Sequence, residues 1–192
     1  PFSQTEKKFS ICVPIYKDTY KDFPKFFKEL DKSDYKNFEV IVVDNDSRES
    51  KSHKYFEQLK KRGVRIVAAP GPFNYSRINN IAVQQSRGDY ICLMNNDIEV
   101  KSPDWLTEML SHAQRQGIGA VGARLWYPNG QLQHGGVVLG LGGVAGVAGH
   151  AHKYLDRDSP GYMGRAKVAQ EFSAVTAACL LVDKSLYLQV GG

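Results

Sequence analysis

Cysteine is scarce in this chain, and none of it is arranged in pairs. The three cysteines, Cys12, Cys92 and Cys179, each lie within an apolar run, and no C-x-x-C spacing occurs. An odd number of cysteines in such surroundings indicates buried thiols in a reducing compartment. This pattern excludes a small scaffold held together by disulfides.

Long apolar segments and targeting signals are also missing. The most apolar stretch, 135–151, is rich in glycine and shorter than the ~20 residues of a membrane span. No basic and apolar leader opens the chain. We therefore expect a cytoplasmic protein. The net charge of +5 suits an anionic ligand or the anionic inner face of a membrane, but the basic residues are scattered. We expect no nucleic-acid partner.

Two common nucleotide-binding motifs are absent as well. The chain has no G-x-x-x-x-G-K-[ST], and no G-x-G-x-x-G follows its first apolar run. These absences exclude a phosphate-loop NTPase and argue against a dinucleotide-binding unit.

The first two thirds of the chain alternate between β-branched apolar runs and helical patterns. The predicted strands are 9–15, 38–43, 64–68, 90–94 and 118–123. The predicted helices are 23–30, 55–62, 78–85 and one that opens at 102–103 and ends near 117. This order predicts a single α/β domain with a mostly parallel sheet flanked by helices.

The pattern changes after Arg124. A Tyr-Pro-Asn-Gly turn at 127–130 separates two short extended runs, which predicts an antiparallel addition. We expect mobile loops over the glycine-dense segment 135–149 and the polar segment 153–165. A buried strand over 173–182 and a helix over 184–190, ended by two glycines, complete the prediction.

Polar clusters follow three of the predicted strands. These clusters are Val-Pro-Ile-Tyr at 13–16, Asp-Asn-Asp-Ser at 44–47 and Asn-Asn-Asp at 95–97. Each alone is compatible with an ordinary turn. Ligands of open α/β sheets gather beyond the carboxyl ends of the strands, so the three clusters together predict a binding site.

These clusters, in this order and spacing, resemble the V-P-x-Y, V-V-D-N-x-S and D-x-D-like elements of glycosyltransferase family 2. The run Gly-Asp-Tyr-Ile-Cys-Leu-Met at 88–94, the run at 176–182 and the terminal Val-Gly-Gly add to the likeness, which covers nearly the whole chain. Within that family, the nearest likeness we suggest is to bacterial members that act in O-antigen synthesis or transfer rhamnose. The resemblance implies one GT-A, Rossmann-like domain over 1–192, with a nucleotide-sugar-binding half (1–123) and an acceptor-side half (124–192).

The resemblance also implies the ligand and its contacts. The donor is a UDP- or dTDP-sugar, and the acceptor is a glycan or a lipid-linked glycan. Mn²⁺ or Mg²⁺ would be held by Asp97 and Asn95, although Asn95 stands where the family has a first aspartate. The residues implied to bind the nucleotide sugar are Pro14, Ile15, Tyr16, Asp44, Arg77, Asn80 and Asn96. Asn74 or Ser76 is expected to cap the helix that carries Arg77 and Asn80.

An inverting transfer also needs a carboxylate base. In the resembled family this group follows a G-G-F-D-E-like stretch, and this chain ends at Gly191-Gly192. We therefore expect the acceptor-side half to be incomplete, so that the chain binds its donor and transfers sugar slowly or not at all. Glu171 is the candidate base within the chain, ahead of Asp156 and Asp158. His134 is interpreted as a loop or core residue. His150 and His152 lie in a glycine-rich loop with two open interpretations, a loop that closes over the donor or a chance metal site.

Two other functions remain open from the residues alone. A sugar-1-phosphate nucleotidyltransferase would use a similar sheet, but its glycine-rich loop after the first strand is replaced here by residues 13–16. A noncatalytic nucleotide-sugar-binding module would need the same binding residues and no base.

Overall fold

A computed structural model describes residues 7–17, 19–141 and 146–192. The chain divides into two compact units. The first comprises Pro1–Val121 together with Ala178–Gly192, and the second comprises Gly122–Ala177. Within the described ranges, no helix is long and apolar enough to cross a membrane.

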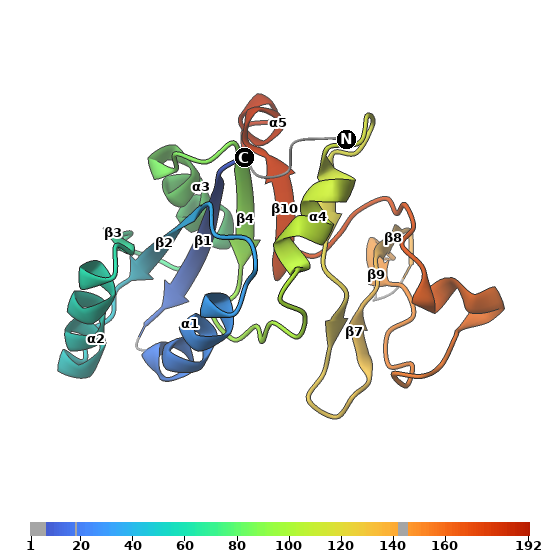
Figure 1. Cartoon of the computed structure of the whole chain (residues 1–192), viewed down its shortest axis with the longest axis horizontal. Coiled ribbons are helices and arrows are strands. Elements are labelled where there is room, and N and C mark those ends of the chain that lie inside the picture. Colours follow the sequence, from blue (N-terminus) through green and yellow to red (C-terminus); the bar gives the residue numbers. More distant parts are fainter. Residues whose placement is uncertain (1–6, 18, 142–145) are drawn as a thin grey trace. The chain divides into compact units, whose positions relative to one another are not determined.

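The first unit is built on a six-stranded sheet of order β3-β2-β1-β4-β10-β5 (Figure 1). Its strands are β1 (Phe9–Tyr16), β2 (Phe38–Asn45), β3 (Arg65–Ala68), β4 (Tyr90–Met94), β5 (Ala120–Gly122) and β10 (Cys179–Asp183). The first four pair in parallel, whereas β10 runs antiparallel to β4. The predicted mostly parallel, helix-flanked sheet is confirmed.

Helices connect these strands in the predicted order. They are α1 (Phe23–Asp31), α2 (Ser50–Lys61), α3 (Tyr75–Gln85), α4 (Trp105–Ala113) and α5 (Lys184–Gln189), with a short 3-10 turn at Thr19–Asp22. In α1 the apolar residues recur at helical spacing and are buried: Phe23, Phe26, Phe27 and Leu30. Asn74 caps α3 as expected, because its side chain accepts a hydrogen bond from the Arg77 amide.

The core of the first unit lies around the central strand β1, which is covered on both faces. Phe9, Ile11 and Val13 are fully buried, and so are the intervening Ser10 and Cys12. A near-continuous apolar run of this kind is typical of a parallel strand between two layers of helices. The three cysteines are all free and buried, as the sequence predicts.

The second unit contains two short antiparallel pairs. β6 (Leu125–Trp126) pairs with β7 (Leu132–His134) across the predicted turn, in which the Gly130 amide bonds the Tyr127 carbonyl at 2.9 Å. β8 (Val137–Leu139) pairs with β9 (Ala148–His150).

The second pair corrects the prediction of a loop over 135–149, although residues 142–145 lie outside the described ranges. Gly136 has φ +113°, and a Cβ there would lie 2.2 Å from the Phe172 ring. The glycines therefore allow close packing of the backbone. A glycine-rich sequence is compatible with both closely packed strands and a loop, so the sequence alone did not separate the two. The second predicted loop, 153–165, similarly leads into a 3-10 segment at Tyr162–Lys167.

The end of the chain also differs from the prediction. The predicted strand 173–182 is observed only as Cys179–Asp183, preceded by a single bridge between Ala174 and Val137. Residues 178–192 belong to the first unit and not to a second half, because β10 pairs with β4 along its whole length. The predicted terminal helix is confirmed as α5.

Candidate functional site

The three polar clusters come together at one edge of the sheet. Ile15 lies opposite Asp44 in the register of β1 and β2, and Cys12 lies opposite Leu93 in that of β1 and β4. Because β1, β2 and β4 are parallel, residues 95–97 leave the sheet at the same edge as Tyr16 and Asn45 (Figure 1). With β1 between them, β2 and β4 are about 10 Å apart across the sheet. The strand order reverses at β1, which is where open α/β sheets bind ligands.

The turns after β1 and β2 are tied to each other. Among the described residues, the Asp44 carboxylate accepts a hydrogen bond from the Ser47 amide at 3.1 Å only, so much of its acceptor capacity is open to a ligand. The Ser47 hydroxyl donates to the Lys17 carbonyl at 3.2 Å. Lys17 and Asp46 both have positive φ, at +48° and +62°. Non-glycine residues are uncommon in this region, and they cluster at functional turns.

Asn45 is a residue of the site that sequence reasoning did not single out. Its side chain is buried and donates two hydrogen bonds, to the carbonyls of Ala69 at 2.7 Å and Gly71 at 2.9 Å. Asp46 adds a third contact, from its carboxylate to the Gly71 amide at 3.1 Å. The end of β2 thereby holds the loop that follows β3. The only sequence signal was the asparagine after Asp44 in an otherwise apolar run.

Arg77 belongs to the same cluster but holds the loop from its other side. Its guanidinium donates to the carbonyls of Pro70 at 3.1 Å and of Ala69 at 3.3 Å, and a longer contact reaches Pro72. These bonds occupy one terminal nitrogen of the guanidinium. Arg77 therefore positions the loop at the carboxyl edge.

Asn80 does not join the cluster. Its amide oxygen accepts a hydrogen bond from the Tyr187 hydroxyl of α5 at 2.5 Å. Helix α5 starts at the opposite edge of the sheet, because the Lys184 amide bonds the carbonyl of Asp89 just before β4. Asn80 instead lines a shallow pocket of about 90 Å³ between α3 and the end of α5.

Two exposed aromatic rings stand at the carboxyl edge. Tyr16 is 44% exposed and Phe73 is 49% exposed, and their rings meet edge to face with centroids 4.8 Å apart. The ammonium group of Lys17 lies 5.0 Å from the Tyr16 ring centroid. Exposed rings beside acceptor groups form a surface suited to a flat heterocycle. Phe73 was not predicted as a site residue.

Residues 95–97 form the third part of the site. The Asn95 amide bonds the Ala178 carbonyl at 2.9 Å, which fixes the start of the turn. The Asp97 side chain is exposed and makes no hydrogen bond or ion pair with any described residue. Two residues further on, Glu99 pairs with Lys25 of α1 and with Lys101.

The donor set at this turn fits a metal that a ligand helps to hold. Among the described residues, no three His, Cys, Asp or Glu side chains gather into a metal-binding group. Asp97 offers a carboxylate, and Asn95 and Asn96 offer amide oxygens. Mg²⁺ commonly binds one or two carboxylates and completes its shell with phosphates and water. The residues therefore fit a hard divalent cation that arrives with a phosphate ligand.

The second unit holds the other predicted residues. Glu171, Asp156 and Asp158 are exposed. His134 is buried, accepts the Thr176 amide at its Nε2 (3.3 Å) and lies 2.9 Å from His150, Nδ1 to Nδ1. Burial, together with the nearby His150, lowers the pKa of His134 to about 4. His134 is thus a neutral, hydrogen-bonded core residue that links β7 to β9. His152 lies just beyond β9 with φ +58°.

Comparison with known proteins places this site in a family. The profile of glycosyl transferase family 2 matches residues 10–143. The chain is 35% identical over 193 residues to the O-antigen biosynthesis protein RfbC of Myxococcus xanthus, covering 96% of this chain and 14% of that protein. It is 50% identical over 165 residues to the uncharacterized protein y4gI of Sinorhizobium fredii, covering 85% and 18%. The chain thus spans less than a fifth of the length of these relatives.

Two solved structures share the fold at low sequence identity. The mannosyltransferase PcManGT from Pyrobaculum calidifontis, in complex with GDP-Man and Mn²⁺, matches with a TM-score of 0.54 and 16% identity over 64% of this chain and 36% of that one. S. aureus TarS 1–349 matches with a TM-score of 0.52 and 21% identity over 65% and 37%.

Proposed function

The chain belongs to glycosyl transferase family 2, and from this premise we propose that it binds a UDP- or dTDP-sugar whose sugar is transferred to a glycan or lipid-linked acceptor. The observation that carries the proposal is the meeting of three polar clusters at the point where the strand order reverses. The family match favours glycosyl transfer over a nucleotidyltransferase reaction.

Each part of the donor has a matching group at the carboxyl edge. The heterocycle lies against the Tyr16 and Phe73 rings and bonds the backbone of residues 14–16. The free acceptor capacity of the Asp44 carboxylate takes a hydrogen bond from the base or the ribose. Asn96 lies toward the ribose. The clamped loop 69–72 forms the wall on the β3 side.

The diphosphate falls at the end of β4, where Asp97 and Asn95 would hold Mn²⁺ or Mg²⁺. The PcManGT complex, which shares the fold, contains Mn²⁺ together with GDP-Man, and this supports a divalent cation as part of the proposed donor complex. Such a cation, when bound, offsets the negative charge of the leaving diphosphate. Asp97 has no internal partner among the described residues, so its carboxylate is available for this role.

The transfer itself needs a group that takes the proton of the acceptor hydroxyl as the sugar carbon is attacked. Glu171 is the candidate for this base within the chain, because it is an exposed carboxylate of the second unit with no ion pair in the described ranges. Glu171→Gln tests this role without a large change of shape. A noncatalytic module would bind the donor equally well and show no turnover in either the parent or this variant.

Calorimetry with UDP, dTDP, GDP and a UDP-sugar, each with and without Mn²⁺, tests the binding proposal. We expect Asp97→Ala to lose the metal-dependent part of the affinity and Asp44→Ala to weaken binding with or without metal. Asp34→Ala, an exposed aspartate after α1, is the matched control. Failure of every nucleotide to bind would refute the proposal, and unchanged metal dependence in Asp97→Ala would refute the metal assignment.

A further inference from the structure

Two arginines of the second unit meet on the same tryptophan. The guanidinium carbon of Arg124 lies 4.3 Å from the Trp126 ring centroid, and that of Arg157 lies 5.6 Å from it. Both contacts are within the range of cation–π attraction. Two segments that are distant in the sequence therefore bring two positive charges to one aromatic surface.

Neither charge is balanced by another described residue. Among the described residues, Arg124 and Arg157 form no ion pair and no hydrogen bond through their side chains. Asp156 and Asp158 flank Arg157 in the sequence, yet neither carboxylate lies within ion-pair distance of either guanidinium. Burial and the neighbouring Arg157 lower the pKa of Arg124 below its usual value. Two like charges that are exposed, held on one ring and paired with no described residue are suited to a ligand of opposite charge.

The backbone holds the two arginines in this arrangement. The segment that carries Arg157 runs beside β7, with hydrogen bonds of 2.8 Å from the Leu132 amide to Leu155 and from the Tyr154 amide to Leu132. The ring of Tyr154 stacks on that of Tyr127 at 5.7 Å and 11°. Pairing and stacking of the neighbouring residues thus fix the backbone before Arg157, and its exposed side chain lies against Trp126.

A third cation of this unit has a different aromatic partner. The Lys153 ammonium lies 5.0 Å from the Tyr154 ring centroid, and a hydrogen bond with Tyr154 raises its pKa. Tyr154 in turn stacks on Tyr127. The two guanidinium groups on Trp126 are therefore the planar donors from which the site is built.

We propose that Arg124 and Arg157 bind a phosphate-class anion, in particular the phosphate or diphosphate ester of an acceptor. Guanidinium groups match phosphate oxygens with pairs of parallel hydrogen bonds, and two of them balance a dianion. The acceptor assignment rests on the proposed glycosyl transfer, but the anion site itself does not. The residues of this anion site all belong to the second unit, whereas those of the donor site belong to the first.

The ester has two possible sources, a soluble sugar phosphate or a lipid headgroup, and two probes distinguish them. Calorimetry with inorganic pyrophosphate, in the Asp97→Ala background and without metal, reports the soluble form. Flotation with phosphatidylcholine vesicles that contain phosphatidic acid, compared with pure phosphatidylcholine, reports the lipid form. Binding to pyrophosphate supports a soluble ester, and binding to the acidic vesicles alone supports a lipid headgroup.

The variant Arg124→Gln/Arg157→Gln should lower the affinity for the probe that binds by about tenfold or more, because it removes charged hydrogen bonds. Arg124→Lys, which keeps the charge and loses the fork, should also weaken binding. The control Arg115→Gln/Arg165→Gln makes the same change of net charge at two exposed arginines elsewhere.

Trp126 supplies a second measurement that needs no arginine variant. In a Trp105→Phe chain the fluorescence comes from Trp126 alone, and pyrophosphate should change it as the guanidiniums turn from the ring to the anion. The proposal is overturned if neither probe binds, or if the double glutamine variant binds as the parent does. Loss of nucleotide binding with retained pyrophosphate binding would instead count against the donor site alone.

Discussion

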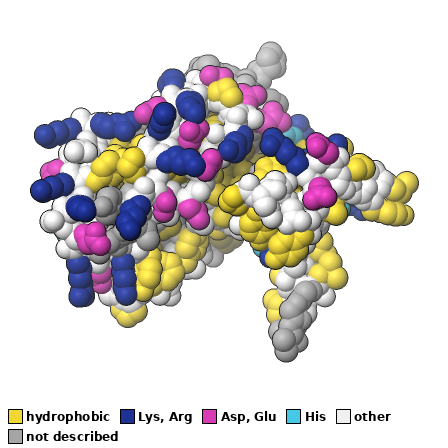
Figure 2. Space-filling model, turned by 90° about the horizontal axis from the view of Figure 1, so that it is seen from below, with side chains coloured by type: hydrophobic (Ala, Val, Ile, Leu, Met, Phe, Trp, Pro, Cys, Tyr) yellow, Lys and Arg dark blue, Asp and Glu magenta, His cyan; other side chains and the backbone are white. Residues whose placement is uncertain are grey.

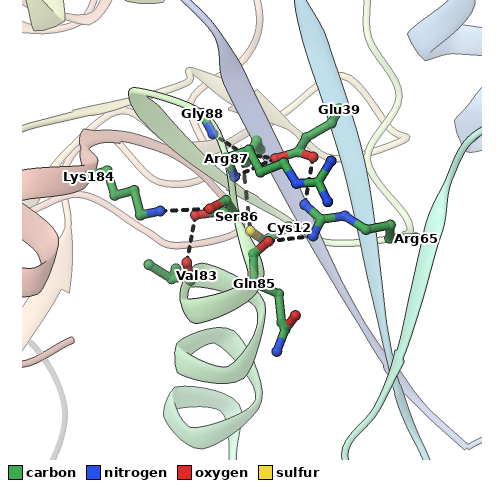
Figure 3. A network of polar contacts seen from close by, with 10 residues as sticks. Cys12, Glu39, Arg65, Val83, Gln85, Ser86, Arg87, Gly88 and Lys184 are labelled. Carbon is green, nitrogen blue, oxygen red and sulfur yellow. Dashed lines mark hydrogen bonds and ion pairs between the residues drawn. The ribbon is translucent and has the colours of Figure 1, made fainter.

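The two edges of the sheet in the first unit use similar polar residues for opposite purposes. At the amino edge, the Glu39 carboxylate accepts hydrogen bonds from the Ser10 hydroxyl and the Arg87 amide, both at 2.6 Å, and pairs with Arg65 at 2.6 Å (Figure 3). Burial alone would raise the pKa of Glu39, but these hydrogen bonds outweigh it and lower the pKa. At the carboxyl edge, Asp97 has no partner among the described residues.

The rest of the amino edge is equally saturated. Lys184 donates to the Ser86 carbonyl at 2.7 Å, and the Gly88 amide donates to the Ser10 hydroxyl at 2.8 Å, so that the turn before β4 is held from two sides (Figure 3). A polar group whose partners are all internal stabilises the fold, whereas one left open can bind a ligand. The open Asp97 carboxylate therefore supports the proposal that the carboxyl edge binds the ligand, although Asn45, Asp46 and Arg77 at that edge have internal partners.

The distribution of charge on the surface does not indicate where a ligand binds. On the face that Figure 2 shows, lysine and arginine side chains are interspersed with acidic ones and do not form a single stripe. Exposed pairs such as Lys60 with Glu57 contribute little to stability. The partners of individual groups are more informative than the distribution of charge.

The largest effect is expected at the amino edge from Gly88→Ala. A Cβ there would lie 2.6 Å from the Ser10 nitrogen and 2.7 Å from the Phe9 carbonyl carbon, and backbone atoms of a central strand cannot move aside. The free energy of unfolding should fall by about 3 kcal/mol, measured by chemical denaturation. Gly119→Ala, with nothing within 4 Å of its Cβ, is the control. Equal stability of the two variants would show that the edge tolerates movement.

His134 extends the comparison to a saturated group in the second unit. Its pKa of about 4 in the folded chain lies below the unfolded value near 6.5, so the unfolded chain binds the extra proton between these values. Stability should therefore decline as the pH falls from about 7 to about 4, by at most roughly 3 kcal/mol. Chemical denaturation across this pH range should show no such decline of the unfolding free energy in His134→Gln. The control His53→Gln, a change at an exposed residue, should keep the decline. A decline that persists in His134→Gln would exclude His134 as its source.

Glu39→Gln should have a smaller effect with a different pH window. The substitution keeps the shape of the side chain and removes the charge that Ser10, Arg87 and Arg65 stabilise, so about 1–2 kcal/mol of unfolding free energy should be lost at neutral pH. Because the folded pKa is lowered, this contribution is present above the unfolded pKa near 4.3 and disappears as the pH falls through the folded value. The stabilities of the two chains should converge in acid. A constant difference down to pH 2 would contradict the assignment.

The smallest change of stability is expected at the carboxyl edge. Asp97→Ala removes an exposed side chain with no internal partner in the described ranges, so the unfolding free energy should stay within about 0.5 kcal/mol of the parent. The same variant should lose metal-dependent nucleotide binding. Thermal unfolding measured beside calorimetry separates the two readouts. A large loss of stability would mean that Asp97 serves the fold, and the contrast between the edges would fail.

The sequence by itself determined the features that depend on local signals. Period and composition predicted the parallel sheet, a helix cap at Asn74 or Ser76 and the turn at 127–130, because each signal lies within a few residues of the feature it specifies. The three polar clusters were also predictable, since the order of strands and helices in a parallel sheet brings the ends of its strands to one edge.

Only the tertiary structure decided what those residues contact. The return of β10 to pair with β4, the bond of Asn80 to Tyr187, and the clamp of Arg77 on loop 69–72 join segments whose meeting no local pattern records. The same holds for the two arginines on Trp126. The conformational propensity of a side chain is a local property. Whether its charge is paired depends on which distant segment packs beside it. The packing of the whole core decides which segments meet.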